Sequence, residues 1–505
     1  MPASRPPMPP VRQHPHLYEI NTSAWLEALS TREGRRISLG SVPDADWDNL
    51  KSQGFDFVWL MGVWKRSLLG RTIMRTTPAY FPSYDEALPD WSMADVVGSP
   101  YSVQDYTPDP RMGGWNELDA ARDKLNARGI RLILDFVPNH TGLDHPWISA
   151  HAEYYVHGTL ADFRRETAAY FLSDDDTGDR CVLIARGKDP YFPAWPDTAQ
   201  LNYFRSDVRE AMLGALRTIA AHADGVRCDM AMLVLNDVFA KTWAKHLGGL
   251  AAPREEFWPA AVTALPEFVW MGEVYWGMEW RLQQLGLNFT YDKHLYDLLR
   301  GDSAQGVRRH LQADLAYQFR LVRFLENHDE PRAAAVFGRE KLPAVATLTA
   351  TLPGMRFFHQ GQLEGKKVHL PIPLRRAAPE PRDPADPQVQ ALYARLLAIT
   401  REDTFHTGDW RLLNALPAGD LTFGNLIAYQ WRAGEAWKVI AVNLGTAPSV
   451  GNIALDGQAD PSKCYLFRDQ LNDRTYEWHG VDLARSGLYV RLDGYCSHVF
   501  DVSVR

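Results

Sequence analysis

Short apolar segments alternate with amphipathic helical patterns along most of the chain. One such helix, Trp115–Arg128, places apolar side chains three or four positions apart and ends before Gly129. Strands that alternate with helices form a parallel sheet, and eight of them close a barrel. The pattern predicts an α/β fold, a (β/α)8 TIM barrel. The predicted strands are His16–Asn21, Phe55–Trp64, Arg131–Phe136, Gly225–Asp229, Glu267–Val274, Asn288–Asp292, Leu321–Glu326 and Met355–Gln360. The other predicted helices are Ser206–Ala221, Asn236–His246, His310–Tyr317 and Pro331–Thr349.

Two stretches break this alternation. Residues 141–200 are rich in Asp, His, Pro and aromatic residues and are too long for an ordinary connection, so we expect a subdomain inserted after the third strand. Near the C-terminus, runs with a period of two predict an antiparallel β-domain. These runs are Leu426–Trp431, Trp437–Asn443, Cys464–Asp469 and Gly487–Leu492. The expected division is a flexible lead-in (1–15), the barrel (16–140 and 201–402), the inserted subdomain (141–200) and a C-terminal β-sandwich (403–505).

Composition narrows the class of partner. Of the 505 residues, 46% are hydrophobic and 23% charged, as in ordinary globular proteins. The formal net charge of −8 argues against nucleic-acid binding, which needs a concentrated positive face. Aromatic residues reach 11%, and several Trp lie close to Gly, Pro or Asp rather than within apolar runs. Exposed indoles would suit the apolar faces of sugar rings, but large aromatics that simply fill a core are an equal alternative. The Trp in question are Trp64, Trp115, Trp147, Trp195 and Trp276.

Features of targeting are absent from the sequence pattern. Met1–Val11 is Pro-rich and has no apolar stretch of the signal-peptide kind, and no run of 18 apolar residues predicts a membrane span. The four cysteines are too few and too scattered for a disulfide framework, and none forms a CxxC pair. We therefore expect a cytoplasmic protein with no membrane partner.

Charged and polar residues gather at the ends of the predicted strands, where the chemistry of such barrels is found. A lone Asp at a strand end commonly caps the following helix. Four acids, two histidines and an arginine on one rim favour an acid–base site, because like charges in a cleft oppose each other's ionisation. The residues at these ends are Asp135, His140, Arg227, Asp229, Glu273, Asn327, His328 and Asp329.

The same strand ends carry a family resemblance. DFVPNH, GVRCDMAM, MGEVYW and FLENHD resemble, in order and spacing, four short motifs of the α-amylase family, glycoside hydrolase family 13. SPYSVQDY, QLNY and PGMRFFHQGQ are similar to that family's second-strand loop, the end of its inserted subdomain and its eighth strand. The resemblance covers roughly His16 to Thr400.

The resemblance implies a role for each matching residue. Asp229 would be the nucleophile, Glu273 the general acid/base, and Asp329 a third carboxylate that holds sugar hydroxyls. Arg227 would keep Asp229 ionised and oriented. The remaining expected substrate-binding residues are Tyr101, which would stack on the sugar, His140, His328 and Asn327. The same resemblance makes Asp135 a structural acid.

Elementary chemistry supports the assignment of the pair. Retaining hydrolysis of a glycoside needs two carboxyl groups about 5–5.5 Å apart, one ionised and one protonated. Arg227 can lower the pKa of Asp229, while neighbouring negative charge can raise that of Glu273.

The sequence departs from the family pattern after the nucleophile. Met232 and Leu233 stand where many α-amylases have Lys and His, the second of which usually gives a backbone carbonyl to calcium. Asn139, the usual first calcium ligand, is present but could equally tie loops together by hydrogen bonds. We expect no cofactor and no calcium requirement.

The resulting hypothesis is a retaining glycosidase that acts on α-glucans or malto-oligosaccharides. Its nearest rival is a transglycosylase that uses the same carboxylates and passes a glucosyl or maltosyl group to a sugar or phosphate acceptor. A remote alternative is a non-catalytic sugar-binding relative. A metal-dependent hydrolase would need clustered His ligands, and the HxH pattern of His14 and His16 falls in the expected lead-in. Exact substrate, chain length and oligomeric state are not determined by the sequence.

Overall fold

A closed barrel of eight parallel strands forms the centre of the computed structural model, which describes residues 8, 10–174, 181–301, 303–381, 383, 386–455 and 457–505. Around the barrel the strand order is β1-β14-β13-β12-β11-β10-β5-β2, so every strand is joined to its neighbours. The strands are β1 (His16–Asn21), β2 (Phe57–Met61), β5 (Arg131–Phe136), β10 (Gly225–Cys228), β11 (Val269–Gly272), β12 (Phe289–Tyr291), β13 (Leu321–Arg323) and β14 (Met355–His359). All eight predicted strands are confirmed, most with shorter bounds.

These segments form barrel strands because both of their faces are covered. Every residue of β2 and β14 is buried, as expected for parallel strands between a barrel interior and a layer of helices. Helix α5 (Trp115–Ala127) shows the complementary pattern: Leu118, Ala121 and Leu125 are buried at helical spacing. Gly129 follows with a φ of 70°, a conformation that suits glycine and turns the chain into β5.

The remaining helices of the barrel region alternate with the strands or extend the connections between them. They are α1 (Thr22–Glu33), α2 (Asp44–Ser52), α8 (Ser206–His222), α9 (Asn236–Trp243), α10 (Phe257–Ala264), α11 (Glu279–Gln284), α12 (Lys293–Arg300), α13 (Ala304–Leu311), α14 (Leu315–Gln318), α15 (Ala333–Thr351), α16 (Asp386–Thr400) and α17 (Thr404–Thr407).

Two predicted helices differ from the structure. The helix predicted over His310–Tyr317 is wrong, because α13 ends at Leu311 and the Asp314 side chain caps the separate helix α14 by accepting from the Ala316 amide. The long helix predicted from Pro331 begins at Ala333 and is interrupted at Gly338, whose φ is 63°.

The inserted region after β5 begins and ends with a paired strand. Strand β6 (His140–Gly142) runs antiparallel to β9 (Thr198–Gln200), so the chain leaves and rejoins the barrel at one place. Between them lie α6 (Trp147–Ala150), α7 (Leu160–Arg165) and the hairpin of β7 (Tyr170–Asp174) with β8 (Cys181–Ala185). The extent of a subdomain over 141–200 stays a prediction.

A second insertion, between β2 and β5, was not predicted. It contains the pair β3 (Trp64–Arg66) and β4 (Val103–Pro108), with α3 (Leu68–Thr76) and α4 (Phe81–Ala87) between them. We call residues 67–98 the cap segment. Buried side chains of the cap segment form a small hydrophobic core of their own with Leu374, from the loop after β14.

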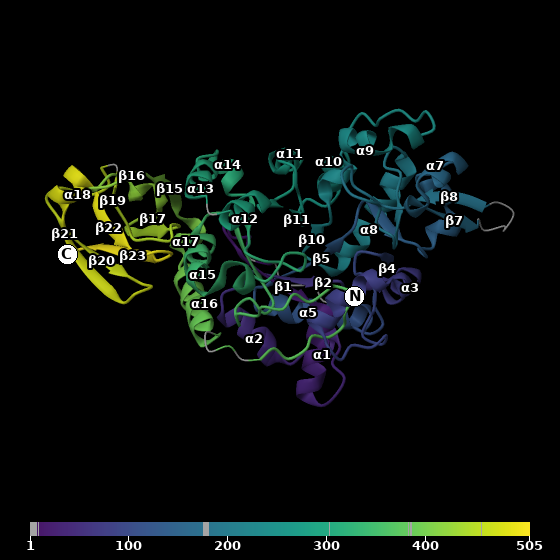
Figure 1. Ribbon diagram of the computed structural model, residues 1–505, viewed down its shortest axis with the longest axis horizontal. Helices are drawn as coiled ribbons and strands as arrows, with labels where there is room; N and C mark the ends of the chain where they lie inside the picture. The colour runs from purple at the N-terminus through teal and green to yellow at the C-terminus, as the bar shows by residue number, and fades with distance from the viewer. Residues whose placement is uncertain are drawn as a thin grey trace.

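The C-terminal region forms two antiparallel sheets, of six and three strands, at one end of the molecule (Figure 1, yellow). This agrees with the predicted β-domain. Tyr429 and Trp431 join it to the barrel by hydrogen bonds to Thr351, at the end of α15. The elements are β15 (Asp409–Leu413), β16 (Ala415–Leu416), β17 (Leu426–Ala433), β18 (Ala436–Asn443), β19 (Ser449–Ile453), β20 (Cys464–Asp469), β21 (Arg474–His479), α18 (Gly480–Ser486), β22 (Leu488–Leu492) and β23 (Ser497–Val504).

The expected lead-in is shorter than predicted. Residues 1–7 and 9 lie outside the described residues. His14 is fully buried, and its Nδ1 accepts a hydrogen bond from the Gly354 amide. Packing against the barrel therefore begins no later than His14, and the boundary at residue 16 is too late.

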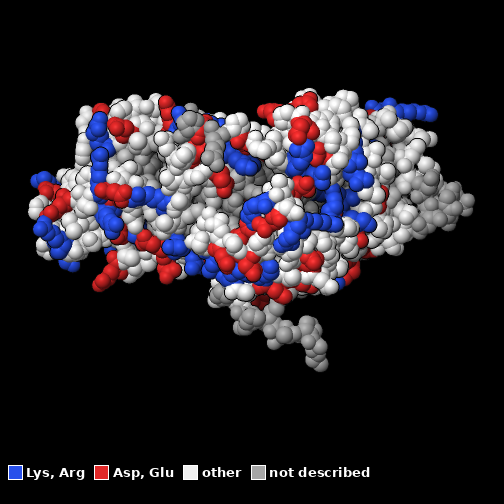
Figure 2. All heavy atoms as spheres, turned by 90° about the horizontal axis from the view of Figure 1, so that it is seen from below, with Lys and Arg blue, Asp and Glu red and all other residues white. Residues whose placement is uncertain are grey.

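The surface carries charges of both signs. On the face shown in Figure 2, basic and acidic side chains are interspersed. None of the helices within the described ranges combines the length and apolar character needed to cross a membrane.

Candidate active site

A cavity of about 450 Å³ opens at the carboxyl ends of the barrel strands. Its volume is typical of small-molecule sites. Three acidic residues predicted at strand ends, Asp229, Glu273 and Asp329, line it together with His140, His328 and Tyr101. The other lining residues are Met74, Tyr80, Ser83, Tyr84, Ser99, Trp195, Pro196, Asp197, Thr198, Met230, His369, Pro371, Ile372 and Pro373.

Arg227 joins the two carboxylates expected to perform the chemistry. Its Nη1 donates a hydrogen bond of 2.6 Å to Asp229 Oδ1, and its Nη2 lies 2.7 Å from Glu273 Oε2. Because Arg227 and Asp229 are two residues apart at the end of β10, both point into the barrel, as the spacing predicted. The guanidinium is fully buried and lies over the rings of Trp59, Tyr101 and Tyr291 at 5.0 to 5.8 Å.

Glu273 is held by hydrogen bonds on both oxygens. The Met230 amide donates to Oε2 at 2.8 Å, and Tyr275 Oη donates to Oε1 at 2.7 Å. Met230 has a φ of 41°, an uncommon conformation for a residue with a side chain, and it follows Asp229 directly. The sharp turn at Met230 thus brings the backbone after the predicted nucleophile against the predicted acid/base.

The pKa directions correct part of the sequence-based expectation. Burial raises the pKa of Asp229 above its ordinary range, and Arg227 opposes this without reversing it. Burial also raises the pKa of Glu273; Arg227 again opposes, while the negative charges of Asp229 and Asp329 raise it further. The expected opposite shifts are therefore not found, because burial raises the pKa of both carboxyl groups and Arg227 opposes the rise in both.

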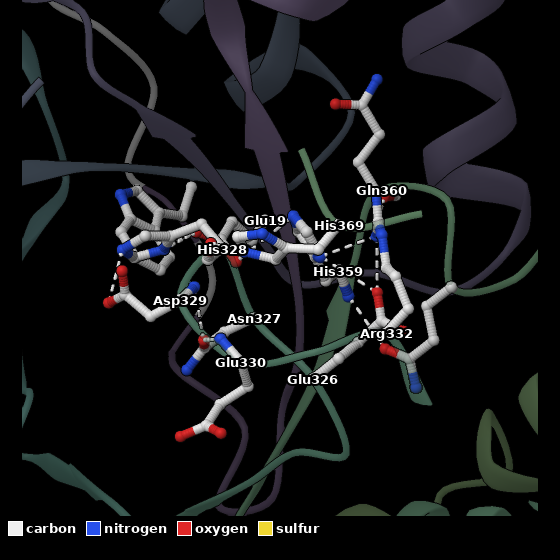
Figure 3. Close-up of polar contacts among 12 residues, drawn as sticks. Glu19, Glu326, Asn327, His328, Asp329, Glu330, Arg332, His359, Gln360 and His369 are labelled. Carbon is white, nitrogen blue, oxygen red and sulfur yellow. Dashed lines mark hydrogen bonds and ion pairs between the residues drawn. The ribbon is translucent and has the colours of Figure 1, made fainter. Parts of the chain in front are cut away.

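His328 links the cavity to a buried carboxylate behind it (Figure 3). Its Nε2 lies 2.7 Å from Tyr101 Oη and 3.0 Å from Asp329 Oδ2, while its Nδ1 lies 2.5 Å from Glu19 Oε1. Burial lowers the pKa of His328, but Asp329 and Glu19 outweigh it and hold that pKa well above the ordinary value. His328 is therefore a cation between two carboxylates. His369 donates a hydrogen bond to its backbone carbonyl.

Asp329 faces the cavity, and its side chain is 48% exposed. Desolvation raises its pKa, but the adjacent His328 outweighs this and brings the pKa to about 2. Asn327 does not line the cavity, contrary to the expectation of a substrate contact. Its Oδ1 accepts hydrogen bonds from the amides of Asp329 and Glu330, both at 2.9 Å, so it shapes the turn that carries Asp329.

A second buried polar cluster lies beside His328 and Glu19 in Figure 3. Arg332 Nη1 donates to Glu326 Oε1 at 2.6 Å, and His359 Nδ1 lies 3.0 Å from the same oxygen. Glu19 lies between the clusters, with its second oxygen 3.9 Å from His359 Nε2. These contacts fix the ends of β13 and β14 beside β1.

The inserted region supplies another wall of the cavity. His140, whose pKa burial lowers to about 4, and Trp195 lie with ring centroids 5.2 Å apart, and both line the cavity. Trp147 packs instead against His145 and Tyr154 and does not line it. Of the other Trp predicted to expose indoles, Trp64 is buried, whereas Trp276 is 37% exposed.

Asp135 has a structural environment. Its carboxylate accepts hydrogen bonds from Trp59 Nε1 at 3.1 Å and from the Gly62 amide at 2.6 Å. It is buried, does not line the cavity, and its pKa is raised by burial to about 6.

Asn139, the usual first calcium ligand of the resembling family, is engaged by another side chain. The Asn139 side chain is paired with that of Gln200: Gln200 Nε2 donates to Asn139 Oδ1 at 3.0 Å, and Asn139 Nδ2 donates back at 3.2 Å. Both amide oxygens are thereby engaged. In the described part of the chain, no three His, Cys, Asp or Glu side chains are grouped so that they could hold a metal ion.

Sequence reasoning missed Glu19, Tyr275 and the cap segment. Glu19 is a fully buried acid inside the strand HLYEIN, and a charged residue in an otherwise apolar barrel strand is itself a signal of a buried partner. Tyr275 lies two residues after Glu273 within a quoted motif. The helices of the cap segment are short, but α3 is amphipathic, and this periodicity could have identified it.

Comparison with known proteins places this geometry in a family. The family model described as "Alpha amylase, catalytic domain" matches residues 48–383, more than half of the chain. Among curated relatives, Alpha-amylase 3 of Dictyoglomus thermophilum is 25% identical over 289 residues, covering 53% of this chain and 54% of that protein. The Trehalose synthase/amylase TreS of Mycobacterium tuberculosis is 26% identical over 239 residues, covering 45% and 34%. The chain thus spans about half the length, or less, of these relatives.

Solved structures support the fold. The maltogenic α-amylase AmyB of Thermotoga neapolitana superposes with a TM-score of 0.68 at 19% identity, covering 98% of this chain and 99% of that one. The α-amylase of Geobacillus thermoleovorans, solved with acarbose, gives a TM-score of 0.64 at 18% identity, covering 98% and 99%. The family model covers most of the barrel, and Asp229, Glu273 and Asp329 line one cavity. The chain therefore belongs to the α-amylase family, glycoside hydrolase family 13.

Proposed function

We propose that the protein is a retaining glycosidase that cleaves α-glucosidic bonds in malto-oligosaccharides or α-glucans. The observation that carries this proposal is the placement of Asp229 and Glu273 on the two terminal nitrogens of Arg227, in a cavity that also contains Asp329. Binding alone would not call for Asp229 and Glu273 on one guanidinium with Asp329 nearby, because each carboxylate raises the cost of ionising the others.

The proposed first step forms a covalent intermediate. The Asp229 carboxylate attacks the anomeric carbon, the glycosidic C–O bond breaks, and Glu273 gives its proton to the leaving oxygen. In the second step Glu273 takes a proton from water, the water oxygen bonds to the anomeric carbon, and Asp229 leaves. Two inversions at one carbon return the α configuration.

The surroundings suit these roles. The direct hydrogen bond from Arg227 favours the ionised form of Asp229 and fixes its orientation. Burial and the neighbouring carboxylates raise the pKa of Glu273, which favours its protonated form. Asp329 is ionised and accessible from the cavity, so it can accept hydrogen bonds from sugar hydroxyls.

The same carboxylates would serve a transglycosylase, in which the hydroxyl of a sugar acceptor replaces water in the second step. Product analysis separates the two outcomes. Malto-oligosaccharides would be incubated with and without added glucose or maltose, and longer or rearranged products would identify transfer.

The mechanism is tested by the configuration of the first product and by two variants. Proton NMR should show the α-anomer before mutarotation; a β-anomer would exclude double displacement. Asp229→Asn should form no glycosyl-enzyme. Glu273→Gln should lose roughly two to four powers of ten in kcat on natural substrates, yet still react with α-glucosyl fluoride, whose leaving group needs no proton. Azide should then release α-glucosyl azide.

A matched control is Asp482→Asn, which removes a carboxylate paired with Arg485 on the C-terminal domain. This variant should retain wild-type kinetics. Equal activity of all three variants would contradict the proposed site.

A further inference from the structure

The cap segment is firmly attached to the loop after β14. Val96 and Leu374 form an antiparallel bridge, the Val97 amide donates to Pro373 O at 2.7 Å, and the Arg375 amide donates to Asp95 O at 2.9 Å. Arg376 adds an ion pair of 2.8 Å with Asp95. Backbone pairing, ion pairs and a shared hydrophobic core make these two segments one wall.

The other end of the cap segment abuts the inserted region. Gly70, in α3, is so close to Asp197 and Ser102 that a Cβ atom there would lie 3.1 Å from Asp197 Cβ and 2.8 Å from Ser102 Oγ. Ser102 Oγ also donates a hydrogen bond to Asp197 O at 2.6 Å. The inserted region, the cap segment and the loop after β14 therefore contact one another in this order around the cavity.

All three parts of this arc line the cavity that holds the carboxylates. Trp195 to Thr198 come from the inserted region, and Pro371 to Pro373 come from the loop after β14. The cap segment contributes Met74, Tyr80, Ser83 and Tyr84.

The order of strands shows which side of the cavity this arc closes. The cap segment follows β2 and the other loop follows β14, and these strands flank β1 in the barrel. Glu273 follows β11, the strand that lies four places from β1 in either direction. The wall thus stands across the barrel from the residue expected to protonate the leaving group.

The chemistry of a glucosyl unit fits this arrangement. Its anomeric carbon must lie at Asp229 and Glu273, and C4, where an α-1,4-linked chain would continue, is on the opposite side of the ring. A sugar oriented in this way directs its 4-hydroxyl toward the wall. By contrast, the β11 loop beyond Glu273 carries Trp276, which is partly exposed, and the leaving group would lie on this side.

Given the proposed function, on which this depends, we infer that the cap segment closes the donor side of the cavity and makes the enzyme end-acting. The substrate class would be α-glucosides and malto-oligosaccharides with a free non-reducing end, and internal bonds of a longer chain would not be cleaved.

The test compares maltoheptaose with the same oligosaccharide whose terminal 4- and 6-hydroxyls are joined as an ethylidene acetal. With the wild-type protein, mass spectrometry should show shortening of the free oligosaccharide at least a hundredfold faster than of the blocked one. Comparable cleavage of both would overturn the end-acting inference while leaving the glycosidase intact. Inactivity on both, and on maltose, would instead overturn the proposed function, and the inference with it.

A variant tests whether the cap segment is responsible. Met74→Ala combined with Tyr80→Ala removes two of its lining side chains, so the rate ratio of free to blocked substrate should fall by roughly tenfold or more. The control is Tyr489→Ala, an exposed ring on the C-terminal domain, which should keep the wild-type ratio. An unchanged ratio in a folded double variant would contradict the role of the cap segment. If that variant does not fold, the comparison of free and blocked maltoheptaose with the wild-type protein still tests whether the enzyme is end-acting.

Discussion

Arg227 and His328 are two buried cations that organise the candidate site. Arg227 contacts both Asp229 and Glu273, and His328 is placed between Asp329 and Glu19. Opposite charges at these distances determine which protonation states exist in the cavity. The protonation states of the cavity carboxylates therefore depend on Arg227, which does not line the cavity, and on His328, which is almost completely buried.

Glu19 is predicted to act as a positioning residue for His328. Glu19→Gln removes the negative charge beside Nδ1, so the pKa of His328 should fall. A neutral His328 no longer lowers the pKa of Asp329 or donates reliably to it. We expect the alkaline limb of kcat/KM to move to lower pH, with roughly a tenfold loss at pH 8 and a smaller loss at pH 6.

The matched control is Glu27→Gln, which changes an acid on neighbouring α1 that lies 3.5 Å from Arg375. Its pH profile should match that of the wild type. A Glu19→Gln variant with the wild-type profile would show that Glu19 only fills space.

At the scale of elements, the inserted region should contribute to binding through Trp195 and not through Trp147. The Trp195 ring lines the cavity beside His140, whereas Trp147 packs within the inserted region. Trp195→Ala should raise KM by roughly two- to tenfold, as expected for the loss of about 0.5–1.5 kcal/mol of ring contact. Trp147→Ala should leave KM unchanged in folded protein, and the reverse result would contradict the assignment of the wall.

The pairing of β6 with β9 should not depend on calcium, because Asn139 and Gln200 bond to each other. Prolonged EDTA treatment is expected to leave Tm and activity unchanged. Gln200→Ala, in contrast, should lower the free energy of unfolding by about 1–3 kcal/mol, because it leaves the buried Asn139 side chain without its hydrogen-bond partner. A fall in Tm with EDTA that calcium alone reverses would refute the prediction.

At the scale of the whole molecule, three buried histidines near the N-terminal end of the barrel should make the protein acid-sensitive. Burial, assisted by Arg356, lowers the pKa of His14 to about 2, that of His406 to about 3 and that of His16 well below its ordinary value. Above the unfolded value of about 6.5 both states are neutral, so stability is complete there. Below it the unfolded chain binds protons that the folded chain excludes, and stability falls.

The loss should approach about 1.4 kcal/mol per pH unit for each histidine, or about 4 kcal/mol for three. Urea unfolding between pH 8 and pH 5 measures it. His406→Asn should reduce the slope by about one proton, while exposed His157→Asn should not. A free energy of unfolding that is constant from pH 7 to pH 5 would contradict this prediction.

Strand ends were predictable because the strands are strongly apolar and because the polar residues at their ends belong to short motifs that resemble those of the family. The converging positions of Asp229, Glu273 and Asp329 followed from that. The shared contact of Arg227 did not, because sequence spacing fixes which face a side chain takes but not how far it reaches. The cap segment escaped prediction for a different reason: its short helices pack in a small core that includes Leu374, a residue nearly 300 positions from α3.

The inferred closure of the donor side would also dictate the order of events in a catalytic cycle. A glucosyl group held against the cap segment would leave only after the remainder of the chain has moved away past the β11 loop. An enzyme closed in this way would release its polymer after every cleavage and bind it again. Such a protein works distributively: it would shorten many chains by one step each before degrading any one of them completely.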